Sequence, residues 1–550
     1  RWCDLFTPRQ LVTLTTFSDL VAEAQAVAHR DAIAAGLADD GVRLRDGGRG
    51  ALAYGEAMGV YLACTIDKSA EYSCTIVPWY AKEDRPKGLF ARQAIPMVWD
   101  FAEANVFASM GGSLSASVRI VADAVSACGI DGAAGAAFQA SAGASVSPSN
   151  RLISTDPPYY DNIGYADLSD FFYVWLRRSL RVTYPELFAT VATPKAEELI
   201  SSPYRHGGKE QAEAFFLNGM TDAMSRLAAG AHLGAPVTIY YAFKQSETDA
   251  HDATSSTGWA TFLEAVIRAG FAINGTWPMR TERGARSIGI GTNALASSII
   301  LVCRPRPADA PTIALRPFIT ELRRVLPDAL RAMRQGEVAP VDLAQAAIGP
   351  GMAIYSRYAA VTGADGNRMP VADALKRINE VLDEVLSEQE GDFDPDTRFA
   401  IAWFDEHGFD GGPFGTANTL AQAKNTSVAG VAQAGIVEAK GGTVRLYRPA
   451  ELPAEWDPSA DARLTVWEAT HHLIRALKHG EAEAGALARR LGATAETARD
   501  LAYRLFAICE RKNRATEALD YNALAQAWAG VAARAAEQCG AGPMAQGRLV

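Results

Sequence analysis

Hydrophobic residues recur at helical spacing over much of the chain. Residues 11–38 and a second stretch ending at residue 72 predict two long helices, with a Gly-rich break at 41–50 between them. Residues 113–128 predict a further helix, and the Ala-, Gly- and Ser-rich tract 129–149 predicts a surface connector. The amino-terminal part is therefore expected to be mostly helical.

The middle of the chain alternates short apolar runs with amphipathic segments. The apolar or β-branched runs predict strands at 152–155, 237–243, 271–277 and 297–302. The amphipathic segments predict helices at 168–176, 210–229 and 258–269. This alternation is typical of an α/β domain, with the first two strands parallel and the last two forming a closing hairpin.

Beyond Pro305 the pattern changes to Ala-rich, charged helices, including one over residues 373–386. Residues 416–447 predict two short helices and a hairpin, a winged-helix-like layout that serves either DNA or partner binding or only packing. Residues 464–533 predict a helical bundle. These changes divide the chain into four expected parts: 1–150, 151–306, 307–460 and 461–550.

The first strand of the α/β region ends at an Asp-Pro-Pro-Tyr motif. Asp156 follows the apolar run directly, and Pro157 and Pro158 fix an extended backbone without N–H donors. The exocyclic amine of a nucleobase is a poor nucleophile, so an enzyme that methylates it needs proton acceptors. Asp156 and the Pro157 carbonyl are suited to accept these protons, and Tyr159 to stack on a flipped base. The alternative is a buried strand that ends in a Pro-Pro turn with an incidental acid.

The motif and its surroundings resemble a family of large bacterial and archaeal adenine-specific DNA methylases, some with a zinc ribbon and often encoded near phage-defence genes. The resemblance extends over the blocks 4–10, 92–103, 156–168, 193–195, 204–209 and 291–295. It implies S-adenosylmethionine as the methyl donor, double-stranded DNA as the substrate, and a Rossmann-like methyltransferase domain with large helical additions before and after it. It also implies other proteins of a defence system as partners.

One departure from the family concerns its Phe-x-Gly-x-Gly-type cofactor loop, which is not found upstream of the motif. The chain starts at Arg1, and its first blocks resemble the middle of the family pattern. We therefore expect a fragment with a partial methyltransferase domain. Asp100 and Glu103, beside aromatic residues, are candidates for cofactor binding; the alternative for Asp100 is a buried, hydrogen-bonded acid.

Net charge is −10, so any DNA contact must come from local basic clusters. Two clusters in Gly-containing loops are the candidates for phosphate contacts, and both are expected at the carboxyl edge of the sheet. Their residues are Lys195, Arg205, His206, Lys209, Arg280, Arg283 and Arg286. A third cluster, Arg177, Arg178 and Arg181, is as readily explained by a solvated helix face.

Seven scattered cysteines without a Cys-x-x-Cys pair support neither a disulfide framework nor a metal site. No apolar run reaches the ~18 residues that span a bilayer, so we expect no membrane partner and a cytoplasmic location. The sequence thus favours a DNA methyltransferase acting on adenine N6. Two alternatives stay open: a cytosine N4 methyltransferase, and a non-catalytic DNA- or partner-binding component of a defence system.

Overall fold

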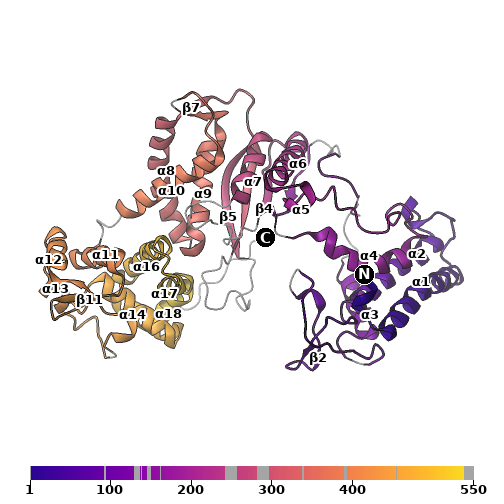
Figure 1. Ribbon diagram of the computed structural model, residues 1–550, viewed down its shortest axis with the longest axis horizontal. Coiled ribbons are helices and arrows are strands. Elements are labelled where there is room, and N and C mark those ends of the chain that lie inside the picture. The colour runs from indigo at the N-terminus through magenta and orange to yellow at the C-terminus, as the bar shows by residue number, and fades with distance from the viewer. Residues whose placement is uncertain are drawn as a thin grey trace. The chain divides into compact units, whose positions relative to one another are not determined.

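The computed structural model describes residues 2–91, 94–108, 110–128, 135, 137, 139–144, 150–161, 163–241, 257–280, 297–336, 338, 340–363, 365–388, 393–453 and 455–537. The chain forms two compact units (Figure 1). The helical unit comprises Arg1–Gln139 and Asp161–Ala212, and the sheet unit comprises Ala140–Tyr160 and Glu213–Val550. Each unit is described separately below.

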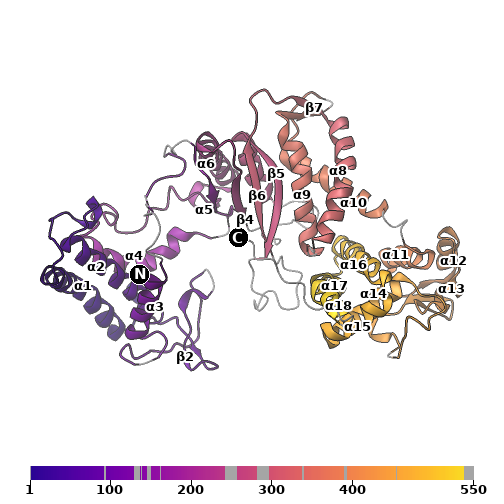
Figure 2. The same cartoon turned by 180° about the vertical axis from the view of Figure 1, so that it is seen from behind.

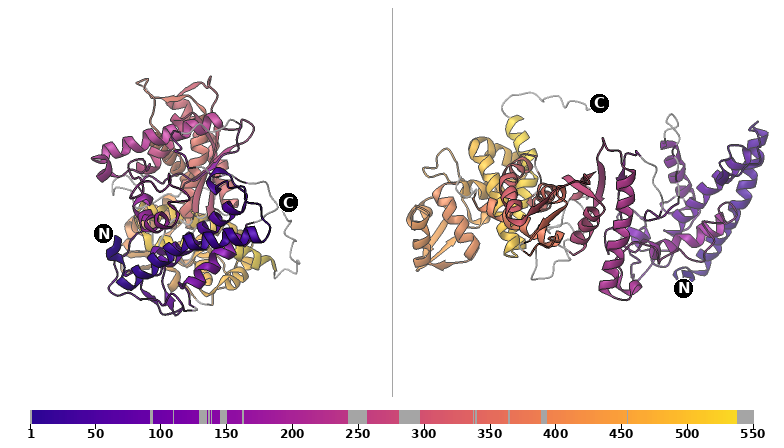
Figure 3. Two further views of the ribbon diagram at one scale, coloured as in Figure 1. Left: turned by 90° about the vertical axis from the view of Figure 1, so that its right-hand side faces the viewer. Right: turned by 90° about the horizontal axis from the view of Figure 1, so that it is seen from above.

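The helical unit is built on α1 (Pro8–Ala34) and α2 (Ala51–Ala70), which pack along each other (Figure 3). Thr7 starts α1 with a capping box, in which its hydroxyl accepts from the Gln10 N–H and the Gln10 side chain accepts from the Thr7 N–H. Shorter elements complete the unit: η1 (Trp2–Leu5), η2 (Leu44–Asp46), β1 (Trp79–Tyr80), β2 (Arg85–Pro86), η3 (Leu89–Ala91), α3 (Leu114–Ala127), α4 (Tyr165–Leu180) and α5 (Pro203–His206). The three helices expected in this part of the sequence are confirmed.

The amphipathic helix that follows the Asp-Pro-Pro-Tyr motif is α4, and it belongs to the helical unit. Phe171 stacks on Phe6 with ring centroids 5.6 Å apart, and Trp175 meets Phe6 edge-on at 5.4 Å. All three side chains are buried in one core with parts of α1 and α2. The structure therefore divides the chain differently from the expected boundary at residue 150, because the apolar face of α4 is buried against amino-terminal residues.

The sheet unit contains a four-stranded sheet in the order β3-β4-β6-β5. Its strands are β3 (Ser154–Thr155), β4 (Val237–Tyr241), β5 (Phe271–Arg280) and β6 (Ser297–Pro305). As expected, β3 pairs parallel with β4, and β5 and β6 form an antiparallel pair. Since β6 is also antiparallel to β4, the strands β3, β4 and β5 share one direction. The first strand is shorter than expected, because only residues 154 and 155 are regularly paired.

Five of the described helices lie to either side of this sheet in Figure 2. They are α6 (Lys209–Gly230), α7 (Thr257–Arg268), α8 (Leu315–Gln335), α9 (Pro340–Arg357) and α10 (Val371–Glu388). The short strand β7 (Thr312–Ala314) precedes α8, and β8 (Ala360–Thr362) follows α9. These two strands pair with each other in parallel. Side chains of Ser356 and Thr276 connect helix α9 to β5 by hydrogen bonds. The Ile273 N–H donates to Ser356 Oγ at 2.7 Å, and Thr276 Oγ1 donates to the Ala346 carbonyl at 3.0 Å.

The carboxy-terminal elements share one continuous core. They are α11 (Pro395–His407), β9 (Gly412–Pro413), α12 (Phe414–Ala423), α13 (Val428–Gln433), β10 (Val437–Lys440), β11 (Thr443–Leu446), η6 (Pro449–Glu451), α14 (Val466–His479), α15 (Glu481–Leu491), α16 (Ala493–Arg511), α17 (Ala515–Gln526) and α18 (Trp528–Glu537). The expected pair of short helices, the hairpin and the helical bundle are thus confirmed. Among the described residues, none of the helices is both long and apolar enough to cross a lipid bilayer.

Candidate functional site

Asp156 lies directly after β3, at the carboxyl end of a strand that pairs in parallel with β4. The register places Ser154 opposite Thr238 and Thr155 opposite Ile239. Asp156 therefore stands beside the last residues of β4, at the edge where open α/β sheets bind ligands. Its side chain is exposed, so the carboxylate is accessible to a substrate.

Tyr159 connects the motif to the end of the neighbouring strand. Its hydroxyl donates a hydrogen bond to Oδ1 of Asp156. Its ring meets that of Tyr241, the last residue of β4, edge-on with centroids 5.2 Å apart. The two contacts fix the ring beside the carboxylate, while Tyr159 itself is only partly buried.

A layer of buried aromatic rings supports Tyr159 from behind. Tyr241 stacks on Phe262 at 4.3 Å and lies 5.0 Å from Trp259, both on α7. Tyr241, Trp259 and Phe262 are all buried. Aromatic packing of this kind gives a rigid support, so Tyr159 is presented as the accessible end of an aromatic stack.

The next residue, Tyr160, anchors the turn on its other side. Its φ of 50° is left-handed, a region that residues other than glycine rarely adopt. Its buried ring packs edge-on against Phe216 at 5.2 Å, and it lies so close to Gly258 that a Cβ there would be 2.8 Å from Tyr160 Cδ1. The packing of Tyr160 thus holds the motif in a backbone shape that sequence alone does not favour.

Sequence reasoning identified the motif but missed its supporting residues Gly258, Trp259 and Phe262. These three fall at the start of the helix predicted for residues 258–269, where their spacing puts the two large rings on neighbouring positions of one face. A glycine followed at once by large aromatic residues was the available signal.

The candidate cofactor residues Asp100 and Glu103 lie in the helical unit. Asp100 is exposed and accepts a hydrogen bond from the Phe101 N–H at 2.8 Å, so the alternative of a buried acid is wrong. Glu103 is bound by the Arg9 guanidinium at 2.5 Å and by the Thr7 hydroxyl at 2.8 Å. The Arg9 hydrogen bond holds the pKa of Glu103 below its usual value, which keeps the carboxylate charged.

A cavity of about 410 Å³ adjoins Glu103 in the helical unit. Arg9, Gln10 and Phe107 also line it. Because Arg9 and Thr7 already occupy the oxygens of Glu103, this carboxylate fits the hydroxyl groups of a nucleoside poorly. The assignment of Asp100 and Glu103 to cofactor binding stays a prediction.

Two candidate DNA-binding cations are matched by acids within the helical unit. Lys195 donates to Asp170 at 2.7 Å. Although burial acts to raise the pKa of Asp170, hydrogen bonds from Lys195 and Thr193 lower it. Arg205 binds Asp167 and Glu198, each at 2.5 Å, and its side chain is only 7% exposed. These ion pairs argue against phosphate contacts by Lys195 and Arg205.

The other basic candidates are placed only in part. His206 ends the short helix α5, and Lys209 is exposed at the start of α6. Arg280 ends β5, while Arg283 and Arg286 fall outside the described residues. In the remaining basic cluster, Arg178 pairs with Asp19 at 2.7 Å, and the Arg177 guanidinium donates to the carbonyls of Phe188 and Thr190.

The described part of the chain contains no group of three or more His, Cys, Asp or Glu side chains arranged to hold a metal ion. Six cysteines within that part are free thiols. Their positions are Cys3, Cys64, Cys74, Cys128, Cys303 and Cys509. Burial raises the pKa of the Cys74 thiol to about 11, so this side chain stays protonated at neutral pH.

Comparison with known protein families gives a match in the carboxy-terminal part of the chain. Residues 394–549 match a family described as a domain of unknown function (DUF8807). These residues correspond to the carboxy-terminal region that starts near α11. No curated protein and no solved structure matches the chain.

Proposed function

We propose that the protein is a methyltransferase that moves a methyl group from S-adenosylmethionine to the exocyclic amine of a flipped DNA base. The preferred target is N6 of adenine. The observation that carries this proposal is the position of Asp156. Its exposed carboxylate follows a strand that runs parallel to β4, with Tyr159 fixed beside it. The proposal includes a partial Rossmann-like methyltransferase domain, in which β3 and β4 would be the parallel strands and β5 and β6 the closing antiparallel pair.

Each residue of the motif has a role in this chemistry. Asp156 accepts a hydrogen bond from the amine and takes up a proton as the new N–C bond forms and the S–CH₃ bond of the donor breaks. The Pro157 carbonyl accepts a hydrogen bond from the second N–H of the amine. Pro158 keeps the backbone extended and adds no N–H donor. Tyr159 stacks on the base, which compensates part of the few kcal/mol lost on base flipping.

The same geometry accepts the amine of cytosine at N4, because both bases present an NH₂ group that needs two acceptors. Cytosine is therefore the second candidate base. Double-stranded DNA is the proposed partner, together with other proteins of a defence system, and the proposed location is the cytoplasm. With Lys195 and Arg205 engaged by acids, Lys209 is the candidate that we propose for a phosphate contact, because it is exposed at the start of α6.

The test is transfer of a labelled methyl group from S-adenosylmethionine to mixed-sequence duplex DNA, followed by digestion to nucleosides. We expect labelled N6-methyladenine, and labelled N4-methylcytosine would identify the second candidate base. Asp156→Asn keeps the shape of the side chain but removes its charge, and should lower the rate at least about 100-fold. Asp309→Asn, at an exposed acid in the turn after β6, is the matched control and should not change it.

Methylation that persists in Asp156→Asn would contradict the proposed role of this residue. If the wild-type chain binds DNA but transfers no methyl group, the non-catalytic alternative is favoured. DNA binding by the Asp156→Asn variant should be unaltered in either case, because the proposed role of Asp156 is in the transfer step.

A further inference from the structure

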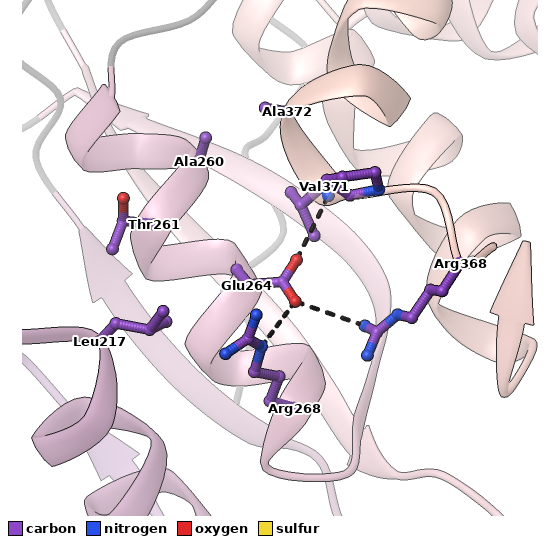
Figure 4. Close-up of a pocket in the computed structure, with 9 residues that line it drawn as sticks. Leu217, Ala260, Thr261, Glu264, Arg268, Arg368, Val371 and Ala372 are labelled. Carbon is purple, nitrogen blue, oxygen red and sulfur yellow. Dashed lines mark hydrogen bonds and ion pairs between the residues drawn. The ribbon is translucent and has the colours of Figure 1, made fainter. Parts of the chain in front are cut away.

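A second cavity, of about 420 Å³, opens along α7 between Ala260 and Arg268 (Figure 4). Its wall combines Glu264 and Arg268 of α7 with Arg368 from the loop before α10. Leu217 and Ala260 supply apolar surface, and Ala372 lies at the start of α10. All of these residues belong to the sheet unit.

The charged end of this cavity lies towards the opposite edge of the sheet from Asp156. Arg268 ends α7, and β5 begins three residues later at Phe271. Because β3, β4 and β5 share one direction, the beginning of β5 marks the amino edge, whereas Asp156 follows the carboxyl end of β3. The arginine end of the cavity is thus set apart from Asp156, whereas its apolar residues Leu217 and Ala260 lie close in sequence to the residues that pack on Tyr160.

Glu264 organises the polar side of the cavity. One carboxylate oxygen accepts from the Val371 N–H at 3.2 Å, and the other accepts from Arg268 Nε at 2.7 Å. The same oxygen lies 3.7 Å from a terminal nitrogen of Arg368. Glu264 is 14% exposed in its side chain, whereas Arg268 and Arg368 are 47% and 38% exposed. The carboxylate therefore positions two guanidinium groups that remain open to a ligand.

The cluster carries more positive than negative charge. Arg268 and Arg368 share the carboxylate of Glu264, and Arg306 lies close enough to Arg368 for electrostatic repulsion between them. Arg306 donates to the backbone carbonyls of Ser356 and Ile267, which are neutral acceptors. Burial, and then the charge of Arg368, lower the pKa of Arg306, as expected where cations are placed together. An anion in the cavity would relieve this repulsion.

We propose that this cavity binds a small organic phosphate of the nucleoside monophosphate class. Each guanidinium has five N–H donors in a planar fork that suits phosphate oxygens, and Glu264 uses few of them. Leu217 and Ala260 offer apolar surface to the nucleoside. This ligand site goes beyond methyl transfer and does not depend on it.

The experiment is calorimetric titration of the full chain with adenosine monophosphate, inorganic phosphate and adenosine. We expect the monophosphate to bind most tightly, inorganic phosphate more weakly and adenosine not measurably. Arg368→Gln removes one guanidinium and should weaken monophosphate binding about tenfold or more. Arg377→Gln is the matched control, because Arg377 is exposed on α10 and pairs with Glu380 at 2.6 Å outside the cavity. It should bind as the wild type does.

A second variant keeps the test valid if Arg368→Gln disturbs folding. Ala372→Glu adds a carboxylate in the first turn of α10, where acids favour the helix, and leaves both arginines in place. It should fold normally, as judged by its melting temperature, and bind the monophosphate about tenfold less tightly.

Absence of monophosphate binding by the wild type would overturn the proposal, as would equal binding by Arg368→Gln and the control. A short DNA duplex is added as a competitor, in order to distinguish a site for a free nucleotide from a site for the phosphates of a DNA backbone. DNA binding that depends on Arg368 without any binding of the monophosphate would assign the arginines to a nucleic acid and also overturn the small-molecule site. Since no methyl transfer is measured, neither result depends on the proposed enzyme activity.

Discussion

The α-carbon of Gly258 lies against the ring of Tyr160, so that a Cβ at this position would be only 2.8 Å from Cδ1 and 2.9 Å from Cγ. Gly258 is buried at the second position of α7, and Tyr160 is held in a left-handed conformation. The close approach of these residues links the turn after Asp156 to the helix behind it. Gly258 is thus required by packing and not by its own backbone angle.

Gly258→Ala is expected to destabilise the sheet unit by about 1–3 kcal/mol, because the added methyl group must displace the Tyr160 ring. Gly415→Ala is the control, since Gly415 is also the second residue of a helix, α12, but a Cβ added there would have no neighbouring atom within 4 Å. At that position the substitution should stabilise by up to about 1 kcal/mol. Urea unfolding measures both, and equal effects would contradict the close packing.

Tyr159→Phe separates the two contacts of this residue. It removes the hydroxyl that donates to Asp156 but keeps the ring that packs on Tyr241. If the ring stacks on the base, methyl transfer should fall less than about tenfold in Tyr159→Phe and by a further factor of about ten or more in Tyr159→Ala. Steady-state transfer rates on duplex DNA check this order. The same loss in both variants would show that the hydroxyl, and not the ring, is what matters.

Arg205→Met should destabilise the helical unit by about 1–3 kcal/mol, chiefly because the largely buried Glu198 carboxylate loses its cation, whereas Asp167 is half exposed. Arg178→Met is the control, since its pair with Asp19 is exposed on both sides and is worth about 1 kcal/mol or less. Thermal unfolding measures the difference. Reduced DNA affinity with unchanged stability in Arg205→Met would instead restore the phosphate-contact role predicted from the sequence.

Glu468 on α14 predicts a pH dependence of stability. Burial, and then the neighbouring Asp461 carboxylate, raise the pKa of Glu468 to about 8. The folded chain therefore keeps a proton that the unfolded chain, with its ordinary pKa near 4.5, releases. This contribution is fully present below pH 4.5 and is lost as pH rises towards 8.

Glu468→Gln should consequently gain stability relative to the wild type as pH increases from about 4.5 to 8, since an amide has no proton to lose. The melting temperature at steps of one pH unit provides the measurement. Glu483→Gln, at an acid that is exposed on α15, should follow the wild type at every pH. A constant difference between Glu468→Gln and the wild type would contradict the raised pKa.

Much of the secondary structure could be predicted because the signals are local. The helix over residues 373–386 and the strands near 237 and 271 have clear hydrophobic periodicity, and all appear within a few residues of the expected bounds. The position of Asp156 at a strand end could also be predicted, because this acid directly follows an apolar run in the sequence. The shortness of β3 could not be predicted, because the paired length of a strand depends on its neighbours more than on its own apolar residues.

Charge partners could not be predicted from the sequence. Arg205 and Asp167 are 38 positions apart, and their pairing arises only when the loop before α5 folds back on α4. A basic residue in a Gly-containing loop looks the same in sequence whether it contacts phosphate or an internal acid. The grouping of α4 with amino-terminal helices was hidden for the same reason, since Phe171 and Phe6 meet across 165 positions.

The division into units has a practical meaning for dissecting the protein. The chain passes from one unit to the other near residues 139, 160 and 212, so neither unit is one uninterrupted stretch. A piece that starts at residue 140 would contain α4 without α1 and α2, and would expose Phe171 and Trp175 to water. Such a truncation invites aggregation. Dividing the protein by its sequence order would therefore separate α4 from the hydrophobic core that it shares with α1 and α2.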